Sequence, residues 1–584
     1  MKKINYILLV LLGFVGLFCS CNTLFDEYAE DKLPEDKIWT DQQLLDGYVL
    51  PWYRGMNNGF SIYMPTNALI RGLGREYLPW YGDQIAVSKA EWYSAAYGDI
   101  LKSDLTEMKR RALSLWSSYY EQLRSVNLLI QHESDIPGTD FKNRVLGEAH
   151  FFRAYYHYLL WRQYGGVPIT TEVYDPLTNA KKTPRASYDE MVTFITSEAA
   201  LAQMYLKDIT YSAEDKGRIT CGAAVMLKAK TYMWAAGAHF QKQEKLYLGF
   251  NTDRSAEMLE KARLVYDELL GMGYSLVPIT GTTQSDIVKG YRTIFLTKNS
   301  QESILEVQHS NDGNYSTGFG HKLDRDAASP YFGGVTAAYT PTQNHVDEYG
   351  MQKGYTYEAQ NPYKNRDYRF YANILYDSCT YHGHVMEIHY NKVNGVDKPA
   401  VDLTPYGESA TAAITKTGYY LGKFVDEAQP IDNNETTASK QNCIIWRFAE
   451  VLLDYAEIDF KQGRLSDALD KVNQIRRRVH MYDLDIISWE AIMNERRVEL
   501  AFEETTYWDL LRYNIASQKM SGATNPVKAM KIVKQDGKAT IYTISNMDKY
   551  PSRVRLYRDF QYYYPIPWDE IRYQGIEQNP EWLE

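Results

Sequence analysis

The stretch EAHFFRAYYHYLLWRQYGGVP, residues Glu148–Pro168, indicates the fold class most directly. Across Arg144–Tyr164 apolar residues recur at spacings of three and four, which is the period of one face of an α-helix. The pattern stops at Gly165-Gly166, and Val167-Pro168 follow. Glycine is favoured just past the end of a helix, and proline cannot continue one. The stretch therefore predicts a long amphipathic helix with a sharp end.

Four further segments in the first half of the chain have the same helical period. They are Trp116–Gln131, Ser187–Met204, Gly217–His239 and Ser255–Leu270. Ser187 stands three residues before Glu190, which is the spacing of a capping box at a helix start. Because each segment is followed by a turn and another helical segment, we expect antiparallel helix hairpins.

Helical patterns return near the end of the chain. We expect helices over Cys443–Gln462, Leu465–Val479 and Trp489–Tyr513. The stretch YAEIDFKQGRLSDALDKVNQI, residues Tyr455–Ile475, looks like one tetratricopeptide unit of two packed helices. A single unit cannot bury its apolar face, so it must stack on the earlier hairpins. The helical body is therefore expected to be discontinuous in sequence.

The middle of the chain has a different composition. Gly, Asn, Asp, Thr and Tyr dominate residues 275–440, with short strand-like runs at Ser303–Gln308 and Val385–Tyr390. Such a segment reads as loops with small strands. The predicted fold is mainly α: a discontinuous tetratricopeptide-like body of helical hairpins with an irregular, loop-rich insert containing short strands. The expected divisions are an N-terminal body (38–274), the insert (275–440) and returning helices with the C-terminal segment (441–584).

The N-terminus has the pattern of an export signal. Lys2 and Lys3 precede the apolar run Ile4–Phe18, which is too short for a comfortable membrane span. Phe18-Cys19-Ser20-Cys21 resembles a bacterial lipobox, so residues 1–20 are expected to be a lipoprotein signal peptide and Cys21 the lipidated residue. Residues 21–37 would then tether the globule to the lipid. A plain secretory signal is the alternative.

Composition and charge exclude several functions. The chain of 584 residues has a formal net charge of −10, which argues against a nucleic-acid partner. Apart from the two N-terminal cysteines, Cys221, Cys379 and Cys443 are far apart and show no metal-ligand spacing, so no disulfide framework, metal site or cofactor is expected. Tyrosine is abundant, at 50 residues, and offers large amphipathic rings for recognition.

Three carboxylates near the end of the chain have a spacing that could suit catalysis. Glu495, Glu499 and Glu503 recur every four residues and could serve acid–base chemistry. Pairing within the helix with Arg496 and Arg497, together with helix packing, explains the row more simply. No catalytic residue is therefore predicted, although a surface glycoside hydrolase with paired carboxylates stays the alternative.

Two other residue pairs could form an ion pair or a metal site. Glu148 and Arg153, five residues apart in one predicted helix, read as a packing pair. His382 and His384 form an H-x-H pattern on a glycine-rich segment, where a metal site would lack further ligands. Tyrosines and tryptophans at helical spacing, such as Tyr155 and Trp234, read as core residues.

Several motifs in order resemble the SusD/RagB family of nutrient-binding outer-membrane lipoproteins. The resemblance covers essentially the whole chain, and its motifs are the following: Glu148–Pro168, Thr183–Tyr188, Gly217–Thr220, Ser300–Gln308, Trp446–Glu457, Asn494–Phe502, Tyr563–Pro567 and Gln578–Pro580. The resemblance implies a lipid-anchored protein facing the cell surface from the outer membrane. It would capture an oligosaccharide and deliver it to a SusC-like TonB-dependent transporter. A peptide-binding member of the family is the other alternative.

The resemblance places ligand contacts in loops after the first helices and in the insert, which correspond to 71–97 and about 312–345. Flat aromatic rings stack on the C–H faces of sugars, and planar polar groups satisfy sugar hydroxyls. The predicted glycan-binding residues are therefore Trp80, Tyr81, Asp83, Gln84, Trp92, Tyr93, Asn314, Tyr315, Phe319 and Tyr331.

Overall fold

The computed structural model describes most of the chain between residues 35 and 582. The described residues are 35–56, 60, 82–86, 105–173, 182–310, 320–333, 337, 339–404, 414–431, 439–503, 505–547, 555 and 557–582, without the side chains of 35, 36, 105–112 and 114. The predicted signal peptide, the lipidation site Cys21 and most of the tether lie outside the described residues.

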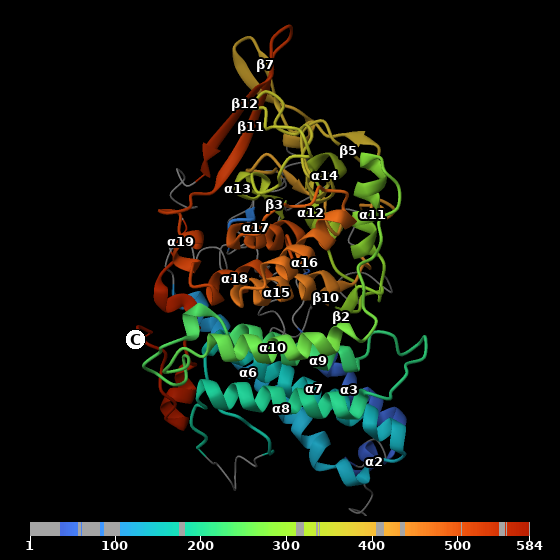
Figure 1. Cartoon of the computed structure of the whole chain (residues 1–584), viewed down its shortest axis with the longest axis vertical. Coiled ribbons are helices and arrows are strands. Elements are labelled where there is room, and N and C mark those ends of the chain that lie inside the picture. The colour runs from blue at the N-terminus through green and yellow to red at the C-terminus, as the bar shows by residue number, and fades with distance from the viewer. Residues whose placement is uncertain are drawn as a thin grey trace, which may run out of the picture.

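Helices stacked in layers form the N-terminal body, the lower half of the molecule in Figure 1. They are α2 (Glu35–Thr40), α3 (Gln42–Arg54), α6 (Leu105–Gln131), α7 (Thr139–Tyr164), α8 (Tyr188–Leu206), α9 (Cys221–Ala235) and α10 (Ser255–Leu270). From α6 to α10 each helix packs on the next, which confirms the predicted hairpins.

Local sequence signals set the helix ends. The Ser187 and Glu190 side chains form the expected capping box at the start of α8. Gly165 ends α7 with φ of 74°, a conformation that favours glycine. By contrast, α9 is shorter than the predicted Gly217–His239, because the Thr220 side chain caps it by accepting a hydrogen bond from the amide of Ala223.

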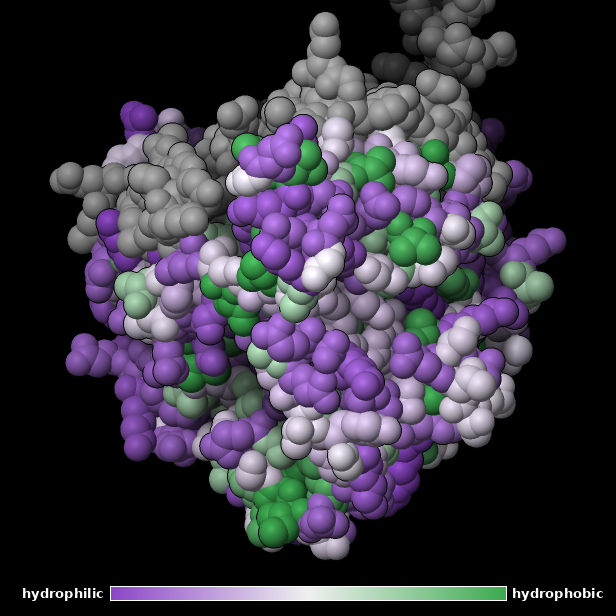
Figure 2. Space-filling model, turned by 90° about the horizontal axis from the view of Figure 1, so that it is seen from above, coloured by the Kyte–Doolittle hydropathy of each residue, from purple (hydrophilic) through white to green (hydrophobic). Residues whose placement is uncertain are grey.

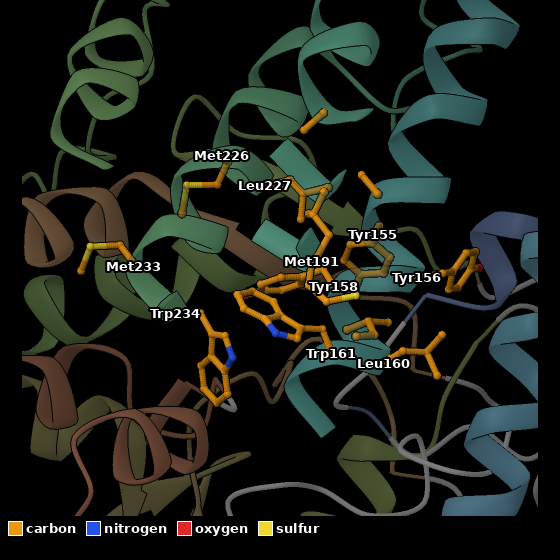
Figure 3. Packing of buried hydrophobic residues seen from close by; sticks show 14 of the residues in the cluster. Tyr155, Tyr156, Tyr158, Leu160, Trp161, Met191, Met226, Leu227, Met233 and Trp234 are labelled. Atoms are coloured by element: carbon orange, nitrogen blue, oxygen red, sulfur yellow. The ribbon is translucent and has the colours of Figure 1, made fainter. Parts of the chain in front are cut away.

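The core of the body is rich in aromatic residues (Figure 3). Tyr155, Tyr156, Tyr158 and Trp161 of α7 are all buried, and so is Trp234 of α9. They pack in one hydrophobic cluster with methionines and leucines from α7, α8 and α9. The interpretation of the helical aromatics as core residues is thus confirmed, which leaves fewer tyrosines available for ligand recognition.

The returning C-terminal segment differs from the expectation in two places. The predicted helix Cys443–Gln462 begins with a strand, β10 (Cys443–Arg447), and only then forms α15 (Phe448–Lys461). The strand forms because its apolar run pairs with β2 (Ser303–Val307). The predicted helix Trp489–Tyr513 is broken into α17 (Trp489–Glu499) and α18 (Thr505–Arg512). Between them Phe502 has φ of 67°.

The tetratricopeptide-like pair is α15 and α16 (Leu465–Arg478), which pack side by side. Polar contacts fix its stacking on the N-terminal body. Lys230 of α9 forms ion pairs with Glu450 (2.7 Å) and Asp454 (3.0 Å) of α15. The Tyr455 hydroxyl donates to Asp267 of α10 at 2.5 Å. The body is therefore discontinuous in sequence, as predicted.

The insert forms the upper part of the molecule in Figure 1. Its helical elements are α11 (Gln284–Leu296), α12 (Leu323–Ala327), η4 (Pro330–Phe332), α13 (Gln343–Val346), α14 (Tyr368–Asn373) and η5 (Val401–Leu403). The thirteen-residue α11, opened by a capping box at Thr283, was not anticipated. The short strands before the final sheet are β1 (Ile85–Ala86), β3 (Thr340–Pro341), β4 (Ile374–Leu375), β5 (Thr380–Tyr381), β6 (His384–Val385) and β9 (Tyr420–Leu421).

A four-stranded sheet stands at the top of the insert (Figure 1). Its strand order is β12-β11-β7-β8, from β7 (Tyr390–Val393), β8 (Val396–Pro399), β11 (Lys528–Lys534) and β12 (Ile541–Asn546). The strand predicted at Val385–Tyr390 is thus wrong in its bounds, since β6 ends and β7 begins at those two residues. No described helix has the length and apolarity needed to cross a membrane.

Candidate ligand-binding face of the insert

A short described part of each region in which ligand contacts were predicted lies next to the other. Ile85 and Ala86 of β1 pair antiparallel with Pro341 and Thr340 of β3. The Thr342 amide donates to the Gln84 carbonyl at 2.9 Å. Residues 82–86 and 340–342 therefore lie side by side, although more than two hundred residues separate them in sequence.

Asp83 is held by buried contacts at the base of this pairing. Its carboxylate forms an ion pair with Arg497 of α17 at 2.5 Å and accepts a hydrogen bond from the Asn525 side chain at 2.8 Å. Burial by itself would raise the pKa of Asp83, but the adjacent Arg497 guanidinium holds it well below its usual range. Asp83 is therefore ionised, and it anchors the loop that carries it.

Gln84 has a similar position. Its side-chain amide donates to the Arg497 carbonyl at 3.2 Å and lies 3.4 Å from Nδ1 of His345. The residue has no exposed surface. Asp83 and Gln84 are therefore buried, and their contacts with Arg497 hold the loop at 82–86 in place.

Seven of the other predicted contacts lie outside the described residues and stay predictions. They are Trp80, Tyr81, Trp92, Tyr93, Asn314, Tyr315 and Phe319. Trp80 and Tyr81 directly precede residues 82–86 in the sequence.

Tyr331 is the predicted contact that the structure places at the surface. Half of it is exposed (50%). Its ring stacks on the imidazole of His384, with centroids 3.7 Å apart and planes at 9°. Phe332 contacts Tyr331 edge-on at 5.0 Å and 89°. Tyr331 and His384 therefore form a flat stacked pair at the surface, which is named the Tyr331–His384 platform below.

The platform is fixed from below by Asp402. This residue is fully buried, and its carboxylate accepts a hydrogen bond from His384 Nε2 at 2.9 Å. The same carboxylate accepts hydrogen bonds from the Glu387 amide (2.7 Å) and the Ser329 hydroxyl. Because η4, β6 and η5 each contribute one group, the ring of His384 is oriented before any ligand arrives.

From the sequence, His384 was a candidate metal ligand only. Its pairing with Asp402 and its stacking on Tyr331 could not be read from a pattern, because neither partner is near it in sequence. Tyr355 and Tyr357 of the insert are two further tyrosines that are about half exposed (54% and 47%). Their alternation outside any helical period is a signal that could have identified them.

A cavity of about 80 Å³ lies where α7 and α9 meet the C-terminal helices. In its lining, the Arg162 guanidinium lies over the rings of Tyr158 (4.4 Å) and Trp508 (4.1 Å). Pockets for organic ligands usually measure about 300–1,000 Å³. The cavity is therefore too small for an oligosaccharide.

The carboxylate row of α17 is buried, and its partners come from other segments. Glu499 accepts from Arg447 at 2.8 Å and from Arg369 at 3.0 Å. Glu495 pairs with Arg369 and Glu503 with Arg447. The packing interpretation holds, but the proposed pairing within the helix is wrong. Burial alone would raise the pKa of Glu499, yet the surrounding arginines hold it well below its usual range.

The suggested pairing of Glu148 with Arg153 is also wrong. Glu148 accepts hydrogen bonds from the Tyr53 hydroxyl (2.8 Å) and from Arg218 (3.1 Å). Arg153 instead forms an ion pair with Glu198 of α8 at 2.7 Å. Residues five apart on a helix project in different directions, so each finds a partner on a different neighbour.

These features define a class of protein: a helical-hairpin body that carries a loop-rich insert with a stacked aromatic pair at its surface. A family model described as the SusD family matches residues 301–582. A second, described as "Starch-binding associating with outer membrane", matches residues 68–233. The chain belongs to the SusD/RagB family.

Individual relatives agree with this assignment over nearly the full length. SusD-like protein P38 of Formosa agariphila is 23% identical over 566 residues, covering 91% of this chain and 95% of the relative. The crystal structure of a SusD-like protein from Bacteroides fragilis superposes with a TM-score of 0.71 and 24% identity, covering 94% of this chain and 100% of that one. Surface glycan-binding protein A from Bacteroides fluxus has a TM-score of 0.61 and 20% identity, covering 93% and 100%.

Proposed function

We propose that the protein binds an oligosaccharide at the cell surface through the exposed face of its insert. The observation that carries this proposal is the Tyr331–His384 platform. The ring of Tyr331 is half exposed (50%), and His384, whose side chain is 15% exposed, backs it from one side. The exposed part of the Tyr331 ring offers a flat surface to the C–H face of a sugar. The fixed position of His384 on Asp402 reduces the conformational entropy lost on binding. The similarity to a protein described as surface glycan-binding supports the same ligand class.

The predicted contacts outside the described residues extend the proposed site. Trp80 and Tyr81 lead into the segment that Asp83 anchors, and Asn314, Tyr315 and Phe319 precede α12 of the insert. We assign these residues, with Trp92 and Tyr93, to further sugar contacts. Their rings and amides are of the types that recognise sugar faces and hydroxyls.

Delivery to a SusC-like TonB-dependent transporter is the second part of the proposal. The lipid at Cys21 would hold the protein on the outer membrane beside its transporter, with residues up to 37 as the tether. Co-purification of the tagged protein with a co-expressed SusC-like transporter from the same organism is expected. A Cys21→Ser variant should leave the membrane fraction, whereas retention there would contradict lipid anchoring at Cys21.

The hydrolase alternative is disfavoured by the buried carboxylates. A general acid must be protonated and must reach the glycosidic oxygen. Glu499 has no exposed surface and a depressed pKa, so it meets neither condition. Incubation with a glycan panel is expected to give no new reducing ends. Turnover that is lost in a Glu499→Gln variant that still folds would reverse this conclusion.

Calorimetric titration with a panel of oligosaccharides tests glycan binding. Tyr331→Ala should weaken the affinity for a bound glycan between about fivefold and about 150-fold, if the stack is worth the about 1–3 kcal/mol that a flat nucleobase gains on an aromatic side chain. Tyr573→Ala is the matched control, because Tyr573 is also well exposed (61%) but belongs to the C-terminal segment after the helical body. Unchanged affinity in Tyr331→Ala would reject the platform, and binding of peptides in place of every glycan would favour the peptide-binding alternative.

A further inference from the structure

The four-stranded sheet at the top of the insert is basic, although the chain as a whole is acidic. The formal net charge of the chain is −10. Within the sheet and its turns, residues 390–399 and 528–546 carry six lysines and two aspartates: Lys392, Lys398, Lys528, Lys531, Lys534, Lys538, Asp397 and Asp536. Figure 2 looks down on this end of the molecule, and its described surface is largely hydrophilic.

Two of these lysines share one carboxylate. Asp397 of β8 forms ion pairs with Lys392 (3.1 Å) on β7 and with Lys531 (2.8 Å) on β11. The Lys531 ammonium also lies 5.0 Å from the centroid of the Tyr390 ring. Both lysine side chains stay well exposed, at 37% and 46%. One carboxylate cannot neutralise two ammonium groups, so this cluster keeps a net positive charge that faces water.

Other lysines of the sheet add to this charge. Lys398 of β8 lies opposite Asn391, and Lys528 begins β11. Both are exposed. Among the residues that the structure describes, no carboxylate forms an ion pair with either of them. Because neighbouring residues of a strand face opposite sides, Lys398 and Asp397 lie on different faces, and positive charge occurs on both sides of the sheet.

The sheet is joined directly to the Tyr331–His384 platform. Asp402, which orients His384, follows the end of β8 by three residues, and His384 precedes the start of β7 by six. Six residues span at most about 20 Å even when fully extended. At the base of the sheet, Ala529 of β11 packs against Ala86 of β1 in one small cluster. The start of β7 at Tyr390 therefore lies at most about 20 Å from His384, so the sheet follows the platform closely along the chain.

We propose that this sheet selects oligosaccharides that carry carboxylate or sulfate groups. The proposal rests on the proposed function, because the platform must first hold a neutral part of the sugar chain. Acidic groups farther along the chain would then meet the lysines. An exposed ammonium attracts an anion from any direction, and the attraction weakens as salt screens it. The sheet would therefore favour acidic glycans over neutral ones without requiring one exact linkage.

Calorimetry on the intact protein with matched pairs of glycans tests the proposal. One pair is oligogalacturonate and the same oligosaccharide after reduction of its carboxyl groups. The other is a sulfated galactan oligosaccharide and its desulfated form, and comparison of the pairs separates the two acidic groups. The acidic member of at least one pair should bind about tenfold more tightly at low salt, since a few exposed ion pairs together give that ratio. The preference should shrink at high salt.

The double variant Lys392→Gln/Lys531→Gln tests whether these two lysines cause the preference for acidic glycans. It should lose most of the preference for acidic glycan and keep the affinity for the neutral form, with an unchanged thermal unfolding curve. Lys245→Gln is the control, because Lys245 is equally exposed (50%) but pairs with Glu577 far from the insert. Equal affinities for both members of each pair would overturn anion selection and leave glycan binding intact. Binding of no glycan at all would overturn the proposed function and this inference with it.

Discussion

Asp83 and Arg497 form an ion pair at 2.5 Å across 414 residues of sequence. The same guanidinium also pairs with Glu348. Arg497 therefore ties the loop at 82–86 and the segment after α13 to helix α17. Because α17 packs on α15 and α16, this contact fixes the loop at 82–86 relative to the helical body.

Replacement of Arg497 by alanine should destabilise the protein strongly. The change leaves the buried Asp83 carboxylate without its cation, and breaking a buried pair in this way typically costs about 3–5 kcal/mol. Urea unfolding followed by circular dichroism measures the loss. Arg477→Ala is the control, because Arg477 makes its ion pairs with Asp470 and Asp483 at the surface and should cost about 0.5 kcal/mol or less. Equal costs would show that the Asp83 contact is not structurally important.

Asp402 is expected to act on ligand affinity through His384. In Asp402→Ala, His384 Nε2, the Ser329 hydroxyl and the Glu387 amide lose an acceptor, which should cost about 1–3 kcal/mol of stability. The imidazole would no longer be held parallel to Tyr331, so the affinity for a bound oligosaccharide should also fall. Asp402→Asn keeps an acceptor oxygen and should recover part of both losses. A normal glycan affinity in a folded Asp402→Ala variant would contradict the positioning role.

Much of the helical body could be predicted because its signals are local. The capping box at Ser187 and the glycine after Tyr164 act within a few residues, and α10 begins and ends where its apolar period does. The strand β10 could not be predicted in the same way. The apolar run Cys443–Arg447 fits the start of a helix as well as a strand, and only its pairing with β2 decides between them.

The candidate site depends on contacts that are remote in sequence. The sequence identified Tyr331 as a loop aromatic, but no pattern connects it with His384 or with the buried Asp402. Asp83 had the side chain expected of a sugar contact, and its ion pair with Arg497 is visible only in the folded structure. Residue type suggested candidate contacts, whereas tertiary packing determines which of their side chains face solvent.

The carboxylate row of α17 is expected to contribute to stability. Glu499→Gln removes the charge that faces Arg447, Arg369 and Arg478. Each of these buried arginines then has one carboxylate fewer to compensate it, which should cost about 3–5 kcal/mol of stability. Chemical denaturation gives this value directly. Glu490→Gln, at an exposed position in the first turn of the same helix, should cost well under about 1 kcal/mol. A small effect for Glu499→Gln would reopen the question of a functional carboxylate there.

Asp454 should make stability depend on pH in a defined range. It is buried, forms ion pairs with Lys230 and Arg496, and accepts a hydrogen bond from the Tyr266 hydroxyl. Burial acts to raise its pKa, but the two cations outweigh burial and lower it below the ordinary value. An aspartate with a lowered folded-state pKa stabilises the fold above its unfolded pKa of about 3.9, and this contribution is lost as pH falls through the folded pKa.

The loss of unfolding free energy caused by Asp454→Asn should therefore have its full size at about pH 7 and pH 5 and should be smaller at about pH 3.5. Urea unfolding of both proteins at each pH measures the difference. Asp536→Asn, in an exposed turn of the insert sheet, should change the free energy of unfolding by less than about 0.5 kcal/mol throughout. If the cost of Asp454→Asn were the same at all three pH values, the charge of Asp454 would not be what stabilises the junction of α9, α10 and α15.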